Sequence, residues 1–329
     1  MKKTFLTKLA VTVAVFSMVA GIFTGCGSKS SSTSGGAKIL FLMTDTNDVF
    51  RKTLADAVVK AGSSQGVTLD MVKTGDSVEA QAKAVAGAKA KGYDAIILRL
   101  EDGSTALQMN VASNGLPIVY INSQPADSHL KANKYVYVGS DEKQAGQYQA
   151  KYVLKKLNNP KSLNVIIFEG EKGHSGTIGR TSAVKETLSD NGCKANYVFV
   201  DYANWSDTES LEKFNIFMKT GQPVDAIFCN NDTMALGVVK GLKQNGMDPA
   251  KIPVTGVDAT ADGCQSISDG GMQFTVLQDA KNQTKKAVEV ARKLAAGGTL
   301  KDISDSSNDQ KYVWVPFKPV DSSNVSDYK

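Results

Sequence analysis

The segment Lys38-Ile-Leu-Phe-Leu-Met-Thr-Asp-Thr-Asn-Asp-Val-Phe50 decides how this chain folds. Its apolar run over 39–43 is nearly continuous, as expected of a strand that is covered on both faces. Polar residues follow at 45–48, and the pattern over 49–63 predicts a helix. A buried strand, a polar turn and a helix together form one unit of a parallel α/β sheet.

The same unit recurs to the end of the chain. Apolar runs predict further strands at 95–100, 118–122, 136–139, 165–168, 197–200, 226–229, 254–257 and 274–277. Amphipathic patterns predict helices at 78–90, 142–157, 234–244 and 281–296. Gly or Asn commonly closes such helices, as at Gly92, Gly115, Gly192 and Gly246. Because 329 residues suffice for two cores, the alternation predicts a doubly wound α/β fold with parallel sheets.

The N-terminus differs from the rest of the chain. Lysines at 2, 3 and 8 precede an apolar run over 9–23, which is too short to span a bilayer and is typical of a signal peptide. The run ends at Phe23-Thr24-Gly25-Cys26, which resembles a bacterial lipobox. We therefore predict a signal peptide over 1–25, lipidation of Cys26, a flexible Ser/Gly-rich linker over 26–37 and an extracytoplasmic, membrane-anchored protein. The alternative is an ordinary signal peptide with an unrelated cysteine.

The composition excludes several kinds of site. The 38 Lys and Arg residues against 33 Asp and Glu give a mild net charge of +5, and they are scattered, so no nucleic-acid-binding face is expected. With two His residues and no metal-like spacing, a structural zinc site is not expected either. Cys193, Cys229 and Cys264 form no CxxC pair and predict no disulfide framework, and Cys229 lies in an apolar run typical of a core.

Polar residues gather where the predicted strands end. In parallel α/β sheets, ligands bind at these carboxyl ends. No GxSxG, P-loop, HExxH or strand-borne GxGxxG motif accompanies them, so the pattern favours a binding protein over an enzyme. The polar residues are Asp45, Thr46, Asn47, Asp48, Asn122, Ser123, Asn230, Asn231, Asp232 and Asp258.

Several segments carry a family resemblance. Residues 230–237 (NNDTMALG), 252–259 (IPVTGVDA) and 276–283 (VLQDAKNQ) resemble type I periplasmic binding proteins. Residues 137–141 (YVGSD), 170–174 (GEKGH) with Arg180, Asn204-Trp205 and the tail from 315 resemble the galactose- and glucose-binding branch of this sugar-binding family of ABC importers. The resemblance runs from about Lys38 to the end, and it rests on the order and spacing of these motifs.

The resemblance implies two lobes with the ligand buried between them by hinge closure. The first lobe would comprise 38–139 and 281–315, and the second 140–280 and 316–329, with crossings near 139–142, 278–281 and 315–317. It also implies a monosaccharide ligand, an ABC importer permease as partner, no cofactor and no catalysis. A sugar-sensing accessory of a chemosensor is an alternative. Transcription regulators share the fold, but they need an N-terminal helix-turn-helix where this chain has a signal segment.

The resemblance also implies nine ligand-binding residues. A pyranose needs flat aromatic faces and planar groups that exchange hydrogen bonds with hydroxyls. Five of the candidates have a structural alternative: core packing for Phe50, helix capping for Asp48 and Asn231, and solvent exposure for His174 and Arg180. Trp205 stands just outside the capping box over 206–209 and lacks a hydrophobic-staple partner, because Ser210 is polar. The nine are Asp48, Phe50, Asn122, His174, Arg180, Trp205, Asn231, Asp258 and Gln278.

Three positions depart from the family pattern. Ser123 stands where a Lys is expected, Gly176 where an Asp is expected, and Gln278 where an Asn is expected. The loss of one cation and one carboxylate leaves the charge of the shell unchanged, which predicts a neutral ligand with a different hydroxyl pattern: another aldose, a pentose or a cyclitol. The region 157–163, which matches a family calcium loop, lacks spaced acidic residues and predicts no calcium.

Overall fold

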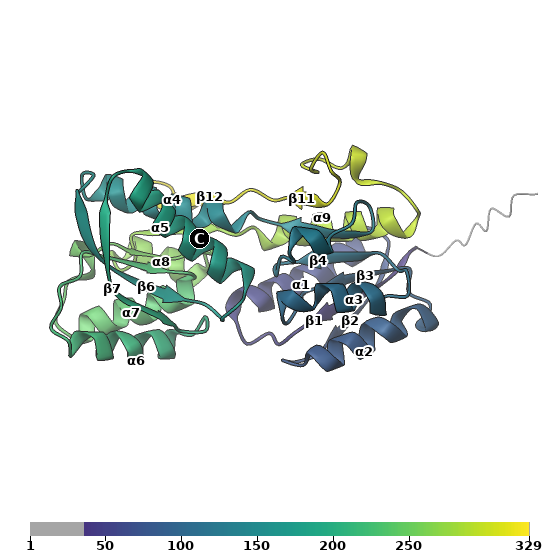
Figure 1. Cartoon of the computed structure of the whole chain (residues 1–329), viewed down its shortest axis with the longest axis horizontal. Helices are drawn as coiled ribbons and strands as arrows, with labels where there is room; N and C mark the ends of the chain where they lie inside the picture. The colour runs from purple at the N-terminus through teal and green to yellow at the C-terminus, as the bar shows by residue number, and fades with distance from the viewer. Residues whose placement is uncertain (1–35, 329) are drawn as a thin grey trace, which may run out of the picture. The chain divides into compact units, whose positions relative to one another are not determined.

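The computed structural model describes residues 36–328, which contain two six-stranded sheets (Figure 1). The predicted signal peptide, Cys26 and nearly all of the linker lie outside these residues. Among the residues described, no helix is both long and apolar enough to cross a membrane.

The first sheet has the strand order β11-β5-β4-β3-β1-β2, and every pair in it is parallel. With its covering helices we call it the first lobe. The strands are β1 (Lys38–Met43), β2 (Thr68–Lys73), β3 (Ala95–Leu98), β4 (Ile118–Ile121), β5 (Tyr135–Gly139) and β11 (Tyr312–Trp314).

Helices cover both faces of this sheet. In β1, Ile39, Phe41 and Met43 pack with α1 (Val49–Ser64) and α9 (Ala280–Ala295). The alternate residues Leu40 and Leu42 pack on the other face with α2 (Val78–Ala88) and α3 (Ala106–Ala112). Because successive strand residues point to opposite faces, burial on both sides requires the continuous apolar run seen in the sequence.

The second sheet has the order β12-β10-β9-β8-β6-β7 and forms the second lobe. All its pairs are parallel except β10 with β12, which is antiparallel. Its strands are β6 (Ser162–Glu169), β7 (Lys194–Tyr202), β8 (Ala226–Cys229), β9 (Val254–Thr255), β10 (Phe274–Leu277) and β12 (Lys318–Asp321). The helices α4 (Glu142–Lys156) and α5 (Ser175–Asp190) cover one face, and α6 (Asp207–Met218), α7 (Asp232–Gln244) and α8 (Ala261–Ser268) cover the other.

Short 3₁₀ helices complete the structure: η1 (Lys89–Lys91), η2 (Gly103–Thr105), η3 (Asp127–His129), η4 (Pro249–Lys251), η5 (Leu300–Asp302) and η6 (Val325–Tyr328). The fold class predicted from the sequence is confirmed, and each of the nine predicted strands is present. The strands β2, β11 and β12 were not predicted. In β2 most side chains are exposed or half-buried, because it is an edge strand, and it therefore lacks the apolar run of a central strand.

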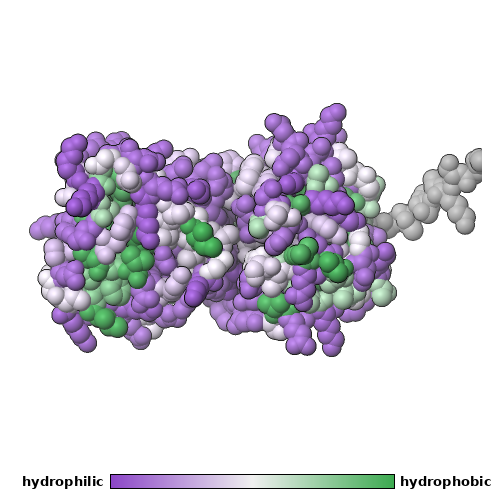
Figure 2. All heavy atoms as spheres, in the orientation of Figure 1, coloured by the Kyte–Doolittle hydropathy of each residue, from purple (hydrophilic) through white to green (hydrophobic). Residues whose placement is uncertain are grey.

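The chain passes between the sheets three times, after β5, after β10 and after β11. The lobe limits predicted above stay predictions. Residues of the two lobes also meet directly: the Ser175 hydroxyl accepts a hydrogen bond from the Gln124 backbone N–H at 2.9 Å. Figure 2 shows a hollow between the lobes on a largely hydrophilic face. Residues that follow the carboxyl ends of β3, β4 and β8 line a cavity between the lobes, which is where parallel α/β sheets generally bind ligands.

Candidate functional site

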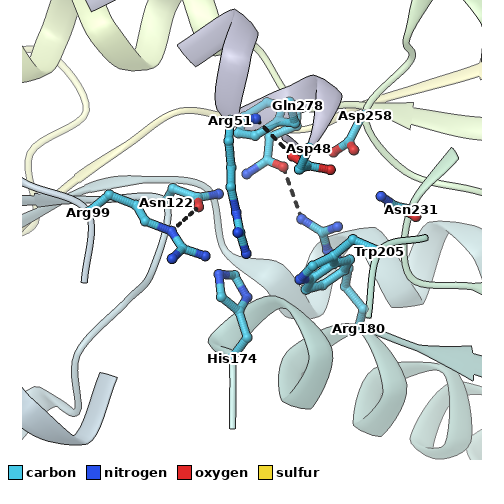
Figure 3. A pocket seen from close by; sticks show the side chains of 11 residues that line it. Asp48, Arg51, Arg99, Asn122, His174, Arg180, Trp205, Asn231, Asp258 and Gln278 are labelled. Carbon is cyan, nitrogen blue, oxygen red and sulfur yellow. Dashed lines mark hydrogen bonds between the residues drawn. The ribbon is translucent and has the colours of Figure 1, made fainter. Parts of the chain in front are cut away.

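Eleven side chains enclose one cavity between the lobes (Figure 3). The empty space between these side chains is about 300 Å³, a volume that includes solvent at the open side of the cavity. All nine sequence-predicted residues lie around it, and two arginines join them. The lining residues are Asp48, Phe50, Arg51, Arg99, Asn122, His174, Arg180, Trp205, Asn231, Asp258 and Gln278.

Two of these side chains leave strand ends on strained backbone. Asn122 follows β4 with φ at 65°, and Asp258 lies beyond β9 with φ at 116°. Trp205, before α6, has φ at 64°. Positive φ in a residue other than glycine costs about 1–3 kcal/mol and concentrates at functional sites, where the surrounding structure imposes it. Three of the predicted ligand residues are therefore held in conformations that folding alone does not favour.

Three helices begin at the cavity, and their capping residues line it. The Asp48 carboxylate accepts from the Arg51 N–H at 2.8 Å at the start of α1. His174 Nδ1 accepts from the Gly176 N–H at 3.0 Å at α5, and Asn231 Oδ1 accepts from the Met234 N–H at 3.0 Å at α7. Each cap uses one polar atom and leaves the other available, so capping and ligand contact do not compete at Asp48 and Asn231.

The aromatic residues form walls of the cavity. The Trp205 ring lies on the Gly170 backbone, where a Cβ would stand 2.1 Å from the ring, so only glycine fits there. The His174 ring meets Trp205 edge-on at 5.3 Å, and the Arg180 guanidinium lies 5.9 Å from its centre. Trp205 therefore packs against residues that are far from it in the sequence, in place of a hydrophobic-staple partner on the helix that follows it. Phe50 both lines the cavity and belongs to the core of the first lobe, so its core alternative also holds.

Arg180 is buried, and the solvent-exposed alternative for it is wrong. Its Nε donates to Glu142 at 2.7 Å and its Nη1 to the Asn230 carbonyl at 2.6 Å. Its Nη2 donates to Gln278 Oε1 at 3.0 Å, and Gln278 Nε2 is buried without a partner in the described part of the chain. His174 is likewise buried.

Sequence reasoning missed Arg51 and Arg99. Arg51 lies on α1, and its guanidinium donates to Asp45 at 2.7 Å and to Glu171 of the second lobe at 2.5 Å. Arg99 follows β3 directly and is fully buried. The sequence offered one indication: Arg99 directly follows an apolar run, and an arginine is rarely buried there unless it is paired.

A model of the periplasmic binding protein domain matches residues 39–299, which is most of the chain. The chain belongs to the periplasmic binding protein family. A D-galactose/methyl-galactoside binding periplasmic protein of Haemophilus influenzae is 28% identical over 316 residues, 92% of this chain and 95% of that protein. The ribose import binding protein of Bacillus subtilis is 26% identical over 292 residues, 87% and 89% of the two chains. An ABC transporter solute binding protein of Bacillus halodurans, solved with bound myo-inositol, has a TM-score of 0.80 at 26% identity, covering 91% of this chain and 99% of that one.

As a periplasmic binding protein, the chain binds a solute and catalyses no reaction. Burial raises the pKa of the Asp48 carboxyl, and raises that of Asp258 well above its usual value although Arg180 opposes the shift. Burial and then the fields of three arginines hold the pKa of His174 well below 6.5. The imidazole is therefore neutral, and because Nδ1 accepts from Gly176, its Nε2 carries the proton.

In this periplasmic binding protein, residues 36–328 contain no cluster of His, Cys, Asp or Glu side chains that could hold a metal ion. Cys193, Cys229 and Cys264 are all buried, and Cys229 lies in the core of the second lobe as the sequence predicted. The site is a partly open cavity lined by donors, acceptors and aromatic surface, which suits reversible binding of a small polar solute.

Proposed function

We propose that this protein is the extracytoplasmic substrate-binding lipoprotein of an ABC importer, and that it binds a neutral monosaccharide or polyol between its lobes. One observation carries the ligand class: every arginine that lines the cavity already has a carboxylate partner. Arg51 pairs with Asp45 and Glu171, Arg99 with Glu101, and Arg180 with Glu142.

This pairing disfavours an anionic ligand. The three guanidinium groups are balanced, and the Asp48 and Asp258 carboxyls face the cavity in addition. A carboxylate or phosphate on the ligand would meet no unbalanced cation and would be repelled by those two groups once they ionise. Hydroxyl groups meet neither penalty, because each can both donate and accept.

The hydrogen-bonding atoms around the cavity match a polyol. Free donors remain on Gln278 Nε2 and His174 Nε2, and the Asp258 carboxylate accepts no hydrogen bond within residues 36–328. Trp205 and Phe50 add apolar surface for the faces of a ring. Donors, acceptors and flat surface together are what a cyclic polyol requires.

The relatives support the same class. The Haemophilus influenzae protein is named for D-galactose and methyl-galactoside, the Bacillus subtilis protein for ribose import, and the Bacillus halodurans structure holds myo-inositol. All of these ligands are neutral and rich in hydroxyls. Because these ligands differ, they do not identify the solute of this chain. Its candidates are galactose, glucose, other aldoses, pentoses and cyclitols.

Two positions bear on that choice. Gly176, where the family resemblance expects Asp, is packed so that a Cβ would stand 3.1 Å from His174 Nδ1 and 3.5 Å from Arg180 Cζ. Ser123, where a Lys is expected, is buried but does not line the cavity. Both groups that the expected residues would present to a galactose-like ligand are therefore absent, which favours a ligand with a different hydroxyl pattern.

Transport follows from hinge closure. An open apo form would admit the ligand, which contacts both lobes and shifts the population to the closed form. A permease then recognises the closed form, while lipid on Cys26 would keep the protein at the membrane. A sensory accessory role uses the same closed form and differs only in its partner.

The test is thermal unfolding of residues 36–329, which form one compact unit, with galactose, glucose, ribose, xylitol and myo-inositol. A ligand at a hundredfold excess over its Kd stabilises the folded state by about 2.7 kcal/mol. A shift with one or more of these compounds supports the proposal and ranks them. No shift with any of these neutral compounds overturns it.

A further inference from the structure

We infer that Arg99 is a specificity-determining residue that donates a hydrogen bond to a hydroxyl oxygen of the ligand. The inference rests on the proposed function and deepens it. None of the family motifs in the sequence contains Arg99, so only its place in the structure points to this role.

Arg99 is a cation held rigidly at the wall of the cavity. Its side chain is fully buried, and Nη1 donates to Thr44 Oγ1 at 3.0 Å. Its Nε donates to Asn122 Oδ1 at 3.3 Å, and Glu101 lies 3.3 Å from Nη1. Three partners thus fix the plane of the guanidinium, which Figure 3 shows beside Asn122 at one end of the cavity.

One nitrogen of this guanidinium is left over. Nη2 is buried and has no hydrogen-bond partner among residues 36–328, and Glu171 Oε2 lies 3.6 Å away, too far for a hydrogen bond. A buried donor without a partner is destabilising, and more so when it carries charge. An acceptor oxygen of the ligand would satisfy it.

The acceptor is a neutral oxygen. Burial and then the nearby Arg51 lower the pKa of Arg99 to about 10, so the group is still a cation at neutral pH. Glu101 and Glu171 already balance that charge. A hydroxyl oxygen therefore suits the site better than a carboxylate, which would face the same two acidic groups.

Asn122 supplies a second hydrogen-bond donor beside Arg99. Its Oδ1 is engaged by Arg99, so its Nδ2 is the atom left for the ligand. Strands β3 and β4 are neighbours in register, with Leu98 opposite Tyr120, which brings the residues after both strands together. Two adjacent donors fit two adjacent oxygens, and we therefore assign a vicinal diol of the ligand to this end of the cavity.

The geometry also explains why Ser123 is tolerated. The resemblance expects a cation there, but Ser123 is buried and does not line the cavity. Arg99 supplies a cation from the neighbouring strand end. A cation at position 99 reaches the ligand from a different place than a cation at position 123 would, which would alter the pattern of hydroxyls that is selected.

The test compares the full chain with its R99M and R99K variants by titration calorimetry, using galactose, glucose, ribose, xylitol and myo-inositol. R99M should weaken binding of the compound that wild type binds best by about 10- to 100-fold, because a charge-assisted hydrogen bond is lost. R99K, which keeps the charge but not the fixed plane, should fall between. Arg292, exposed on α9, provides the control: R292M should bind as wild type does.

Deoxy analogues of that compound provide a second readout. Wild type should discriminate against the analogue that lacks one hydroxyl of the diol, and R99M should lose this discrimination while keeping it at the other hydroxyls. Unchanged affinity and unchanged ranking in both variants overturn the inference but leave the proposed function standing. If wild type binds none of the polyols, the proposed function fails and the inference fails with it.

Discussion

Both carboxylate oxygens of Glu171 accept hydrogen bonds from Arg51 Nη2 at 2.5 Å, which joins the second lobe to helix α1 of the first. Arg51 lines the cavity, whereas Glu171 does not and is about one-third exposed. The same carboxylate lies 3.6 Å from Arg99. One acidic group of the second lobe therefore contacts two cavity-lining arginines of the first, and it can do so only when the lobes are together.

The first prediction concerns this contact. E171Q should weaken ligand binding about two- to tenfold, because the closed form loses a charged partner that is only partly shielded from water. Apo protein should also be more open, which small-angle scattering would detect as a larger radius of gyration.

E186Q is the matched control, since Glu186 pairs with Lys143 on the surface of the second lobe alone. It should change neither quantity. If E171Q binds and scatters as E186Q does, the contact between Arg51 and Glu171 has no part in closure.

The second prediction concerns Asp258. Burial raises the pKa of this carboxyl well above its usual value, and no hydrogen bond from the described residues compensates it. D258N should therefore make the apo protein more stable, while the loss of the carboxyl group as a hydrogen-bond partner of the ligand weakens binding about 10- to 100-fold. Asn tolerates the positive φ of this position better than most residues.

Thermal unfolding with and without the ligand measures both effects of D258N. D262N, at an exposed position of α8, is the control and should leave the ligand-induced shift unchanged. A D258N protein that keeps the full ligand-induced shift would remove Asp258 from the binding site.

The third prediction uses the two tryptophans of the chain. Trp205 lines the cavity, whereas Trp314 stacks on Tyr312 at 4.8 Å in the first lobe and does not line it. Ligand should change the fluorescence of wild type and of W314F, and W205F should lose the change. W205A should in addition weaken binding by at least about tenfold, since an apolar wall of the site is removed. A ligand signal that follows Trp314 would contradict the assignment.

The fourth prediction concerns pH. Burial raises the pKa of Asp232 to about 7, although hydrogen bonds from Thr275 and Thr260 oppose the shift. The folded form thus binds this proton more tightly than the unfolded form, whose pKa is near 3.8. The stabilising contribution is complete below that value and is lost as the pH rises through about 7.

The D232N variant should not lose stability in this way as the pH rises. Between pH 5 and pH 8, the free energy of unfolding of wild type should fall by roughly 2–3 kcal/mol relative to D232N. Denaturant titrations at several pH values measure it. The buried neutral His174 acts in the opposite direction, but it does so in both proteins and cancels in the comparison. Parallel pH profiles for the two proteins would show that Asp232 does not titrate in this range.

The sequence by itself determined the fold class and most of the elements. The reason is local: strands such as β3 and β8 are buried on both faces and must be apolar throughout, and the helices between the strands carry recognisable caps and periodicity. Family resemblance supplied nine cavity-lining residues, because those positions recur in recognisable motifs. The lipid anchor and the lobe limits remain predictions.

Tertiary structure alone decided which side chains complete the site. Arg99 and Glu171 are 72 residues apart in the numbering (171 − 99), and nothing local in the sequence relates them. Only the approach of the lobes brings Glu171 to Arg51, and only burial leaves Arg99 Nη2 without a partner. Hydrogen bonding and burial depend on the distance between atoms from separate strands and helices, and that distance is set by packing, not by the order of residues along the chain.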